Sequence, residues 1–331
     1  MFPKRVNFNR LCCMIKARNC KRNFYTIKTE LPPLVTGEWL ETQLQRENVK
    51  IVDGSYHLPS AERDPAKEFS QERIPGAVFF DIDEIADKKS KFKHMMPSKD
   101  NFEVAMSQLG ICHDDIIVIY DTTGIFSAPR VWYTFKTFGA KNVHILDGGY
   151  PLWKLENRKI ETGEMTGGYQ YERKAFSAKD GTKNSIIDLK GIHKILMGVQ
   201  KDITIVDARH FDRFTGKQDA GPGLRSGHMP GAYSLFYKRL LTPDGYKFKS
   251  VNELKQEFIN SKIDINEPIV TTCGSGVTAA IINFAIHLIQ YNEYSDDNNF
   301  PKMTLYDGSW AEYGSRTDTP IKKIDPTLTE V

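Results

Sequence analysis

The chain has 331 residues, of which 40% are hydrophobic and 26% charged, a composition typical of a folded protein with room for two domains. Its net charge of +3 is unevenly distributed, because residues 1–28 hold eight basic side chains and no acidic one. The remainder is weakly acidic, which excludes the basic surface that nucleic-acid binding needs. The longest strongly apolar stretch, 279–289, is too short to cross a bilayer, so we expect no membrane-spanning segment.

Residues 1–28 are typical of a mitochondrial presequence, because they are basic, free of acidic residues and without the long apolar core of a secretory signal. The segment contains no serine, and an unstructured basic tail is the alternative interpretation. Met14 could also start a shorter product. We therefore expect a mitochondrial protein, with an additional cytoplasmic form as a second option.

Four landmarks occur twice in the same order: a strand ending in aspartate, a Pro-Gly-Ala turn, a buried strand entering a loop, and an Asp-Gly turn before an aromatic residue. The offsets between matching residues are nearly constant, at 154, 155 and 160 for Asp53 to Asp207, Gly76 to Gly231 and Gly148 to Gly308. A period this long predicts two whole domains rather than a solenoid.

Each half alternates short apolar strands with helical stretches, which predicts an α/β domain with a mainly parallel central sheet. Helices are expected at 35–46, 100–109, 251–261 and 278–291. The domains are expected at 32–160 and 186–323. Residues 161–185 contain four glycines and many polar side chains, and they are the predicted linker.

Three of the five cysteines lie in the basic start, which leaves Cys112 and Cys273. Two cysteines make no disulfide framework, and neither has the spacing of a metal ligand set. Cys112 has no glycine-rich loop beside it and is expected to be a partly buried turn residue. Cys273 follows the β-rich run 268–272, so it lies at the carboxyl end of a predicted strand, where open α/β sheets bind their ligands.

Gly274 and Gly276 let the backbone after Cys273 curl tightly and expose its N–H groups. The helix predicted at 278–291 then directs its amino-terminal end at the sulfur, which adds to an anion-binding nest of amides. Lowering a thiol pKa by about 2 units makes roughly three-quarters of it thiolate at neutral pH. We therefore predict that Cys273 is a nucleophile; a buried structural cysteine is the alternative.

The loop from Cys273 to Thr278, of sequence CGSGVT, resembles the active loop of the 3-mercaptopyruvate group of tandem rhodanese sulfurtransferases. Segments 73–83, 127–132 and 307–310 resemble the same family, and the similarity covers about residues 32 to 323. The resemblance implies two rhodanese-like domains, each with a mainly parallel central sheet flanked by helices. It also implies a catalytically silent first domain, in which Asp121 stands where the second has Cys273.

The resemblance implies a role for several further residues. Ser275, His94 and Asp83 match a proton shuttle in which the aspartate orients the histidine and the histidine exchanges a proton with the serine. Arg213 matches a substrate-binding arginine, suited to a carboxylate by its planar pair of donors. Substrate contacts are also implied for the loop residues Gly274, Gly276, Val277 and Thr278. A solvated surface histidine and a surface ion pair are the alternatives for His94 and Arg213.

One departure from the family concerns a second substrate-binding arginine. Gly221 stands at the best-matching position, which weakens the expected carboxylate clamp. Arg225, four residues further on, is a candidate replacement. Arg209 lies two residues after Asp207 and is expected to be a buried structural partner rather than a ligand.

The resulting hypothesis is ping-pong sulfur transfer from 3-mercaptopyruvate, through a Cys273 persulfide, to a thiol acceptor such as thioredoxin or to cyanide, with release of pyruvate. It implies no metal and no organic cofactor. The nearest alternative is thiosulfate sulfurtransferase, disfavoured because its enzymes resemble one another in basic residues at the places of Gly274 and Ser275. A Cys-dependent phosphatase would need an arginine where Ala279 stands. A non-enzymatic sulfur carrier or redox-sensing module would form the persulfide without turnover.

Overall fold

The protein is represented by a computed structural model that describes residues 31–163, 175–293 and 303–324. The expected presequence, 1–28, and residues 164–174 of the expected linker lie outside the described residues. None of the helices in the described ranges has the length and apolar character needed to cross a membrane.

Each half of the chain folds around its own five-stranded sheet, and every strand pair in both sheets is parallel. The first sheet has the order β1-β6-β5-β2-β4, with strands β1 (Leu34–Val35), β2 (Val49–Asp53), β4 (Val78–Phe79), β5 (Ile116–Tyr120) and β6 (Val143–Leu146). The second has the order β8-β12-β11-β9-β10, with strands β8 (Ile186–Ile187), β9 (Thr204–Asp207), β10 (Tyr233–Ser234), β11 (Ile269–Thr272) and β12 (Met303–Tyr306). The two orders correspond strand for strand, which confirms the internal repeat.

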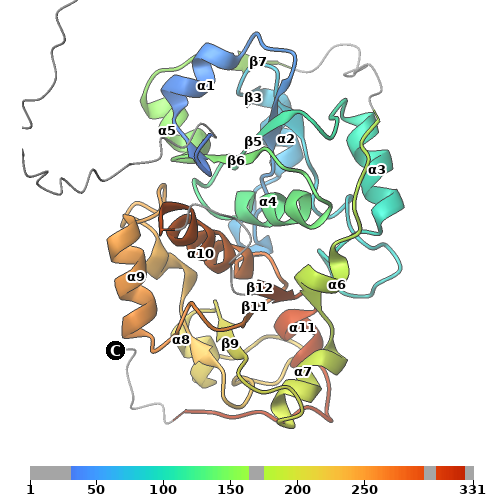
Figure 1. The fold of residues 1–331 in the computed structure, drawn as a ribbon, viewed down its shortest axis with the longest axis vertical. Helices are drawn as coiled ribbons and strands as arrows, with labels where there is room; N and C mark the ends of the chain where they lie inside the picture. Colours follow the sequence, from blue (N-terminus) through green and yellow to red (C-terminus); the bar gives the residue numbers. More distant parts are fainter. Residues whose placement is uncertain (1–30, 164–174, 294–302, 325–331) are drawn as a thin grey trace, which may run out of the picture. The chain divides into compact units, whose positions relative to one another are not determined.

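Helices flank both sheets, as parallel strands require for their crossover connections (Figure 1). Those of the first half are α1 (Gly37–Gln43), α2 (Pro65–Gln71), α3 (Lys99–Gln108), α4 (Ala128–Thr137) and α5 (Gly149–Leu155), with a 3₁₀ turn η1 (Pro59–Ala61). Those of the second are α6 (Thr182–Ser185), α7 (Leu189–Leu196), α8 (Phe211–Thr215), α9 (Val251–Asn260), α10 (Ala279–Glu293) and α11 (Ser309–Tyr313), with η2 (Tyr237–Leu240). The four helices expected from the sequence are present with shifted ends.

Local sequence explains several helix boundaries. Ser98 accepts a hydrogen bond from the amide of Asn101 at the start of α3. Ser250 and Glu253 form a reciprocal capping box at the start of α9. By contrast α10 is apolar nearly all round, and most of its side chains are buried.

The first half extends past residue 160, where the sequence placed its end. Strand β7 (Glu161–Thr162) pairs with β3 (Glu72–Arg73) in a small antiparallel sheet. Further on, Phe176 is buried against Phe102, with ring centroids 5.3 Å apart. A single aromatic residue in a polar stretch has no periodicity to reveal its burial, so the sequence did not separate this packed part of 161–185 from a free linker.

The two halves share one continuous core across the packed pair α4 and α10 (Figure 1). Trp132 of α4 stands edge-on to Phe284 of α10, with ring centroids 4.9 Å apart, and also contacts His287. The carboxyl ends of β5 and β11, which carry Asp121 and Cys273, lead directly into these two helices.

Candidate active site

Cys273 lies in the loop between β11 and α10 and is only 2% exposed. Its amide donates to the hydroxyl of Ser309 at 3.2 Å, and its carbonyl accepts from the amide of Trp310 at 3.0 Å. The first turn of α11 therefore fixes the cysteine backbone, and α10 begins six residues after Cys273 at Ala279. This geometry agrees with the strand, loop and helix expected around the thiol.

The loop after Cys273 presents backbone donors without protein acceptors. Within the described chain, the N–H groups of residues 274–278 form no hydrogen bond. Buried backbone donors are rarely left unpaired unless a ligand, an ion or water takes the place of a protein partner. Backbone donors arranged in this way are able to bind an anion beside the sulfur.

The matching loop of the first half shows what such a loop binds. The carboxylate of Asp121 accepts five backbone N–H groups: Oδ1 from Thr123 and Gly124 at 3.0 Å each, and Oδ2 from Phe126 at 2.8 Å and from Ser127 and Ala128 at 2.9 Å each. Ala128 is the first residue of α4, so the helix amino terminus joins this nest. In the first half the loop thus closes on its own anion, whereas in the second that place is held by Cys273.

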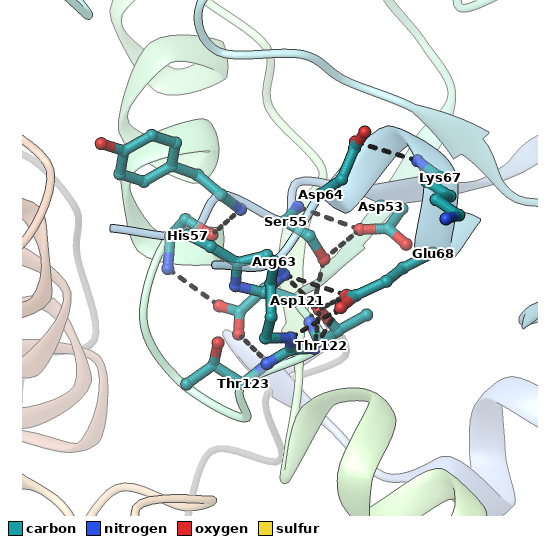
Figure 2. A network of polar contacts seen from close by, with 12 residues as sticks. Asp53, Ser55, His57, Arg63, Asp64, Lys67, Glu68, Asp121, Thr122 and Thr123 are labelled. Atoms are coloured by element: carbon teal, nitrogen blue, oxygen red, sulfur yellow. Dashed lines mark hydrogen bonds and ion pairs between the residues drawn. The ribbon is translucent and has the colours of Figure 1, made fainter. Parts of the chain in front are cut away.

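A network of polar side chains closes the region around the Asp121 loop (Figure 2). Glu68 accepts from Arg63 at 2.6 Å and 2.7 Å and lies 2.9 Å from His57 Nε2, with Thr122 at 3.3 Å. These groups satisfy one another. At the site that corresponds to Cys273 the first half has an aspartate in place of a sulfur, and most of the loop amides around it already bind that carboxylate.

His94 and Asp83 lie together, as the sequence predicts. Nδ1 of His94 is 3.1 Å from Oδ1 of Asp83, although this contact does not meet hydrogen-bond geometry. The His94 side chain is 2% exposed. Its burial lowers the pKa of the imidazole, an effect that Asp83 opposes, so the ring is neutral at pH 7.

Ser275 is half-buried beside Cys273, and its hydroxyl has no hydrogen-bond partner among the described residues. In particular no bond joins it to His94. The structure therefore places Asp83 next to His94, and the proton shuttle through Asp83, His94 and Ser275 stays a prediction.

Arg213 lies on α8, near Cys273, with its side chain partly buried. Its guanidinium donates to the carbonyl of Ala220 at 3.4 Å, and it forms no ion pair with a carboxylate in the described ranges. Burial and the neighbouring Arg209 lower the pKa of Arg213, while Asp207 and the Cys273 thiol raise it. The surface ion pair considered from the sequence is therefore wrong, and the arrangement suits an anionic substrate.

Arg225 does not replace the missing family arginine. Its guanidinium donates to the carbonyls of Tyr313, Gly314 and Thr319 and to the Thr319 hydroxyl, so it anchors the segment after α11. Gly221 has a left-handed φ of +99° with open space around it. The suggestion that Arg225 reaches the site is therefore wrong, because the four acceptors in 313–319 hold it elsewhere.

Arg209 is the structural residue that the sequence predicts. It binds both carboxylate oxygens of Asp207, at 2.6–3.0 Å, and the carbonyl of Gly227 at 2.8 Å. Its guanidinium lies 4.0 Å from the ring centroid of Trp310, close enough for a cation–π contact. Cys112 is partly exposed, as expected, and its amide donates to Asp115.

Two partly buried tyrosines within range of the Cys273 charge were missed by sequence reasoning. Burial raises the pKa of Tyr56 and of Tyr237 to about 12, and the charge of Cys273 contributes to both shifts. Tyr56 also meets His94 edge-on, with ring centroids 4.6 Å apart. Both phenols keep their protons at neutral pH and can donate to an anion. The available signal for Tyr56 was its place three residues after the strand-ending Asp53.

Comparison with known proteins identifies the family of this chain. The model of the rhodanese-like domain matches residues 36–156 and 193–316. The 3-mercaptopyruvate sulfurtransferase of Rattus norvegicus is 35% identical over 86% of this chain and 92% of its own length. The thiosulfate/3-mercaptopyruvate sulfurtransferase 1, mitochondrial, of Arabidopsis thaliana is 31% identical over 88% of this chain and 79% of its own length.

The fold comparison agrees with these matches. The crystal structure of SseA from Escherichia coli, described as a 3-mercaptopyruvate sulfotransferase with the rhodanese fold, is 31% identical. It superposes with a TM-score of 0.73 over 85% of this chain and 99% of its own. With two matching domains, a single cysteine at the loop of the second and relatives similar over nearly their whole length, the chain belongs to the rhodanese family, in the tandem-domain group of the 3-mercaptopyruvate sulfurtransferases.

Proposed function

We propose that this protein is a sulfurtransferase that takes sulfur from 3-mercaptopyruvate and gives it to a thiol acceptor or to cyanide, with Cys273 as the sulfur carrier. The observation that carries the proposal is the ring of unpaired amides at residues 274–278 beside the Cys273 thiol. A partly buried Arg213 without a carboxylate partner in the described chain adds a site for the substrate carboxylate.

The first half-reaction moves one sulfur atom and one proton. The Cys273 thiolate attacks the substrate sulfur, a sulfur–sulfur bond forms, and the carbon–sulfur bond breaks with its electron pair left on the methylene carbon as pyruvate enolate. Arg213 and the amides of Gly274, Gly276, Val277 and Thr278 stabilise the developing negative charge. The proton of the substrate thiol passes through Ser275 and His94, oriented by Asp83, to the enolate carbon, so pyruvate leaves and a Cys273 persulfide remains.

In the second half-reaction the acceptor attacks the outer sulfur of the persulfide and Cys273 returns to its thiolate. A small thiol or a dithiol protein such as thioredoxin is the proposed acceptor. The persulfide lies in a loop whose donors stabilise its negative charge, and the phenols of Tyr56 and Tyr237 add two further donors near the sulfur.

Side-by-side kinetics with 3-mercaptopyruvate and thiosulfate test this proposal. We expect a higher kcat/KM for 3-mercaptopyruvate, because Gly274 and Ser275 supply no side-chain cation for a thiosulfate dianion. Cys273→Ser should remain folded and lose turnover with both donors. A higher kcat/KM for thiosulfate would favour the alternative activity, and turnover by Cys273→Ser would refute the cysteine mechanism.

We also propose a mitochondrial location, on the basic, acid-free character of residues 1–28 and the mitochondrial designation of the Arabidopsis relative. Imaging of a fusion that retains residues 1–28 and of one that begins at Met14 tests this. The first should enter mitochondria and the second should stay in the cytoplasm.

A further inference from the structure

A buried ion pair connects the two halves of the chain next to the active site. Arg130 lies in α4 of the first half, and Asp307 lies in the turn between β12 and α11 of the second. Nη2 of Arg130 is 2.7 Å from Oδ1 of Asp307, and each side chain is 3% exposed. Neither residue is assigned a role in the mechanism above.

The same pair binds the two loops that must cooperate in sulfur transfer. Arg130 donates to the carbonyl of His94 at 2.6 Å and to the carbonyl of Gly276 at 3.3 Å. Asp307 accepts from the amide of Met96 at 2.5 Å. The loop that carries His94 and the loop that carries Cys273 are therefore anchored to one ion pair, although they belong to different domains.

Both anchored loops have unusual backbone conformations at the anchor points. His94 has a φ of 61°, a left-handed conformation that is uncommon for a residue with a side chain. Gly276 has a φ of +78°, and a Cβ there would lie 3.2 Å from Nη1 of Arg130 and 3.0 Å from the carbonyl oxygen of Asp307. The bond from Arg130 to the His94 carbonyl is one of the contacts that hold His94 in this conformation.

Stability alone does not account for this ion pair. Two charges lose their hydration on burial, and a well-packed apolar pair of similar size is often as stable or more so. A charged pair does supply directional bonds, and here those bonds end on the backbone of a predicted proton carrier and of the loop that carries the nucleophile.

We propose that Arg130 and Asp307 are positioning residues for sulfur transfer, which hold His94 of the first domain in place relative to the Cys273 loop of the second. The inference rests on the proposed role of His94. It assigns to the pair a part in catalysis through geometry, without contact to substrate.

The charges around His94 give the proposal a second measurable consequence, the pKa of the His94 imidazole. Burial has the largest effect and lowers the pKa of His94; Arg130 and Lys93 lower it further, whereas Asp83 and Asp307 raise it. The neutral Tyr56 phenol also faces the ring. Removing the charge of Arg130 should therefore raise the pKa of His94, and removing that of Asp307 should lower it.

The test compares Arg130→Lys, Arg130→Met and Asp307→Asn with the wild-type protein. Two properties are measured: turnover of 3-mercaptopyruvate and the pKa of the His94 ring by NMR titration. The His94 signal is assigned as the one that disappears in His94→Asn. Because misplacing a reacting group by about 1 Å costs up to about a hundredfold in rate, we expect each variant to lower kcat by about tenfold or more with little change in KM. The His94 pKa should rise in Arg130→Met, fall in Asp307→Asn and stay near the wild-type value in Arg130→Lys, which keeps the charge but lacks the second donor group.

Arg73→Lys is the matched control. Arg73 is 3% exposed, pairs with Glu161 and donates to the carbonyls of Phe69 and Gly163, all within the first half of the chain. Its replacement measures the general cost of changing a buried arginine and should leave kcat and the His94 titration near wild type. Thermal unfolding of every variant shows which ones are folded. If Arg130→Met does not fold, the comparison relies on Arg130→Lys and Asp307→Asn.

The outcomes separate this inference from the proposed function. Wild-type protein that does not turn over 3-mercaptopyruvate would refute the function, and unchanged turnover in His94→Asn would refute the shuttle. If the wild-type protein turns over 3-mercaptopyruvate and His94→Asn does so more slowly, the positioning role can be judged separately. It is then overturned if kcat in Arg130→Lys and Asp307→Asn is no lower than in Arg73→Lys. It is equally overturned by His94 shifts of the same sign in Arg130→Met and Asp307→Asn.

Discussion

The proposed recognition of the substrate carboxylate depends on a single guanidinium group. Arg213 is partly buried, donates only to a backbone carbonyl at 3.4 Å, and has no carboxylate partner in the described ranges. No second arginine among the described residues supports Arg213, because Gly221 stands at the position of the other family arginine and Arg225 is anchored to residues 313–319.

Arg213→Met should raise KM for 3-mercaptopyruvate by about tenfold to a hundredfold, because a charge-assisted hydrogen bond contributes about 1.5–3 kcal/mol. Lys217→Met, which removes an exposed cation four residues away, controls for the general loss of positive charge and should leave KM near wild type. A similar KM increase in both variants would show that Arg213 acts only through long-range charge.

The strand-ending aspartates of the two halves have opposite environments. Asp207 is bound by Arg209, whereas Asp53 is buried without a cationic partner in the described chain and accepts from the amide and hydroxyl of Ser55. Burial raises the pKa of Asp53 to about 7, against the lowering effect of the Ser55 hydrogen bonds. Since the folded chain keeps this proton after the unfolded chain has released it, stability from Asp53 is complete below about pH 4 and is lost as pH rises to about 7.

Asp53→Asn should therefore stabilise the protein at pH 8, by on the order of 4 kcal/mol at most, with the gain shrinking toward zero near pH 4. Asp207→Asn is the control from the repeat: it leaves a buried arginine without its carboxylate and should destabilise by about 3–5 kcal/mol. Chemical denaturation across this pH range measures both. A loss of stability in Asp53→Asn at pH 8 would contradict the predicted titration.

At the scale of elements, the loop from β11 to α10 contains two glycines that differ in backbone conformation and in the space around them. Gly276 has a φ of +78° and is enclosed by Asp307 and Arg130, whereas a Cβ at Gly274 would find no atom within 4 Å. Gly276→Ala should destabilise the fold by about 1–3 kcal/mol, because it forces a side chain into a strained conformation and a crowded space. Gly274→Ala should leave the unfolding temperature nearly unchanged, and equal shifts in the two variants would contradict this account.

The sequence predicted this loop well, because its signals are local. The β-rich run 268–272, the glycines and the apolar helix that follows define a strand, a tight turn and a buried helix without further information. Arg130, Asp307 and Tyr56 could not be ranked in the same way. Their roles depend on contacts between residues far apart in the chain, such as the 2.7 Å ion pair of Arg130 with Asp307, and an arginine in a helix has no local feature that predicts such a partner.

At the scale of the whole molecule, one core passes from the first half to the second. The Trp132–Phe284 contact and the Arg130–Asp307 pair both cross between the repeats. Multi-domain chains often unfold in steps, but a shared core favours a single transition. Calorimetry should therefore show one peak for the wild-type protein, and two resolved transitions would show that the halves are independent.

Trp132→Ala tests how strongly the halves depend on each other. Truncating a buried tryptophan costs about 3–5 kcal/mol, and here the lost contacts belong to both repeats. We expect the single transition to move to lower temperature as a unit. A melting profile in which only one half loses stability would contradict the shared core.

The carboxylate of Asp121, held by five amides, has a consequence for loading stoichiometry. Two loops of the same ancestry are present, yet the first is permanently occupied by a group that no donor can displace, because it is covalently part of the chain. Treated with excess donor and no acceptor, the protein should therefore hold one cyanide-removable sulfur per polypeptide rather than two. In the proposed mechanism the first domain therefore supplies His94 to the chemistry of the second, while its own loop, closed on Asp121, carries no sulfur.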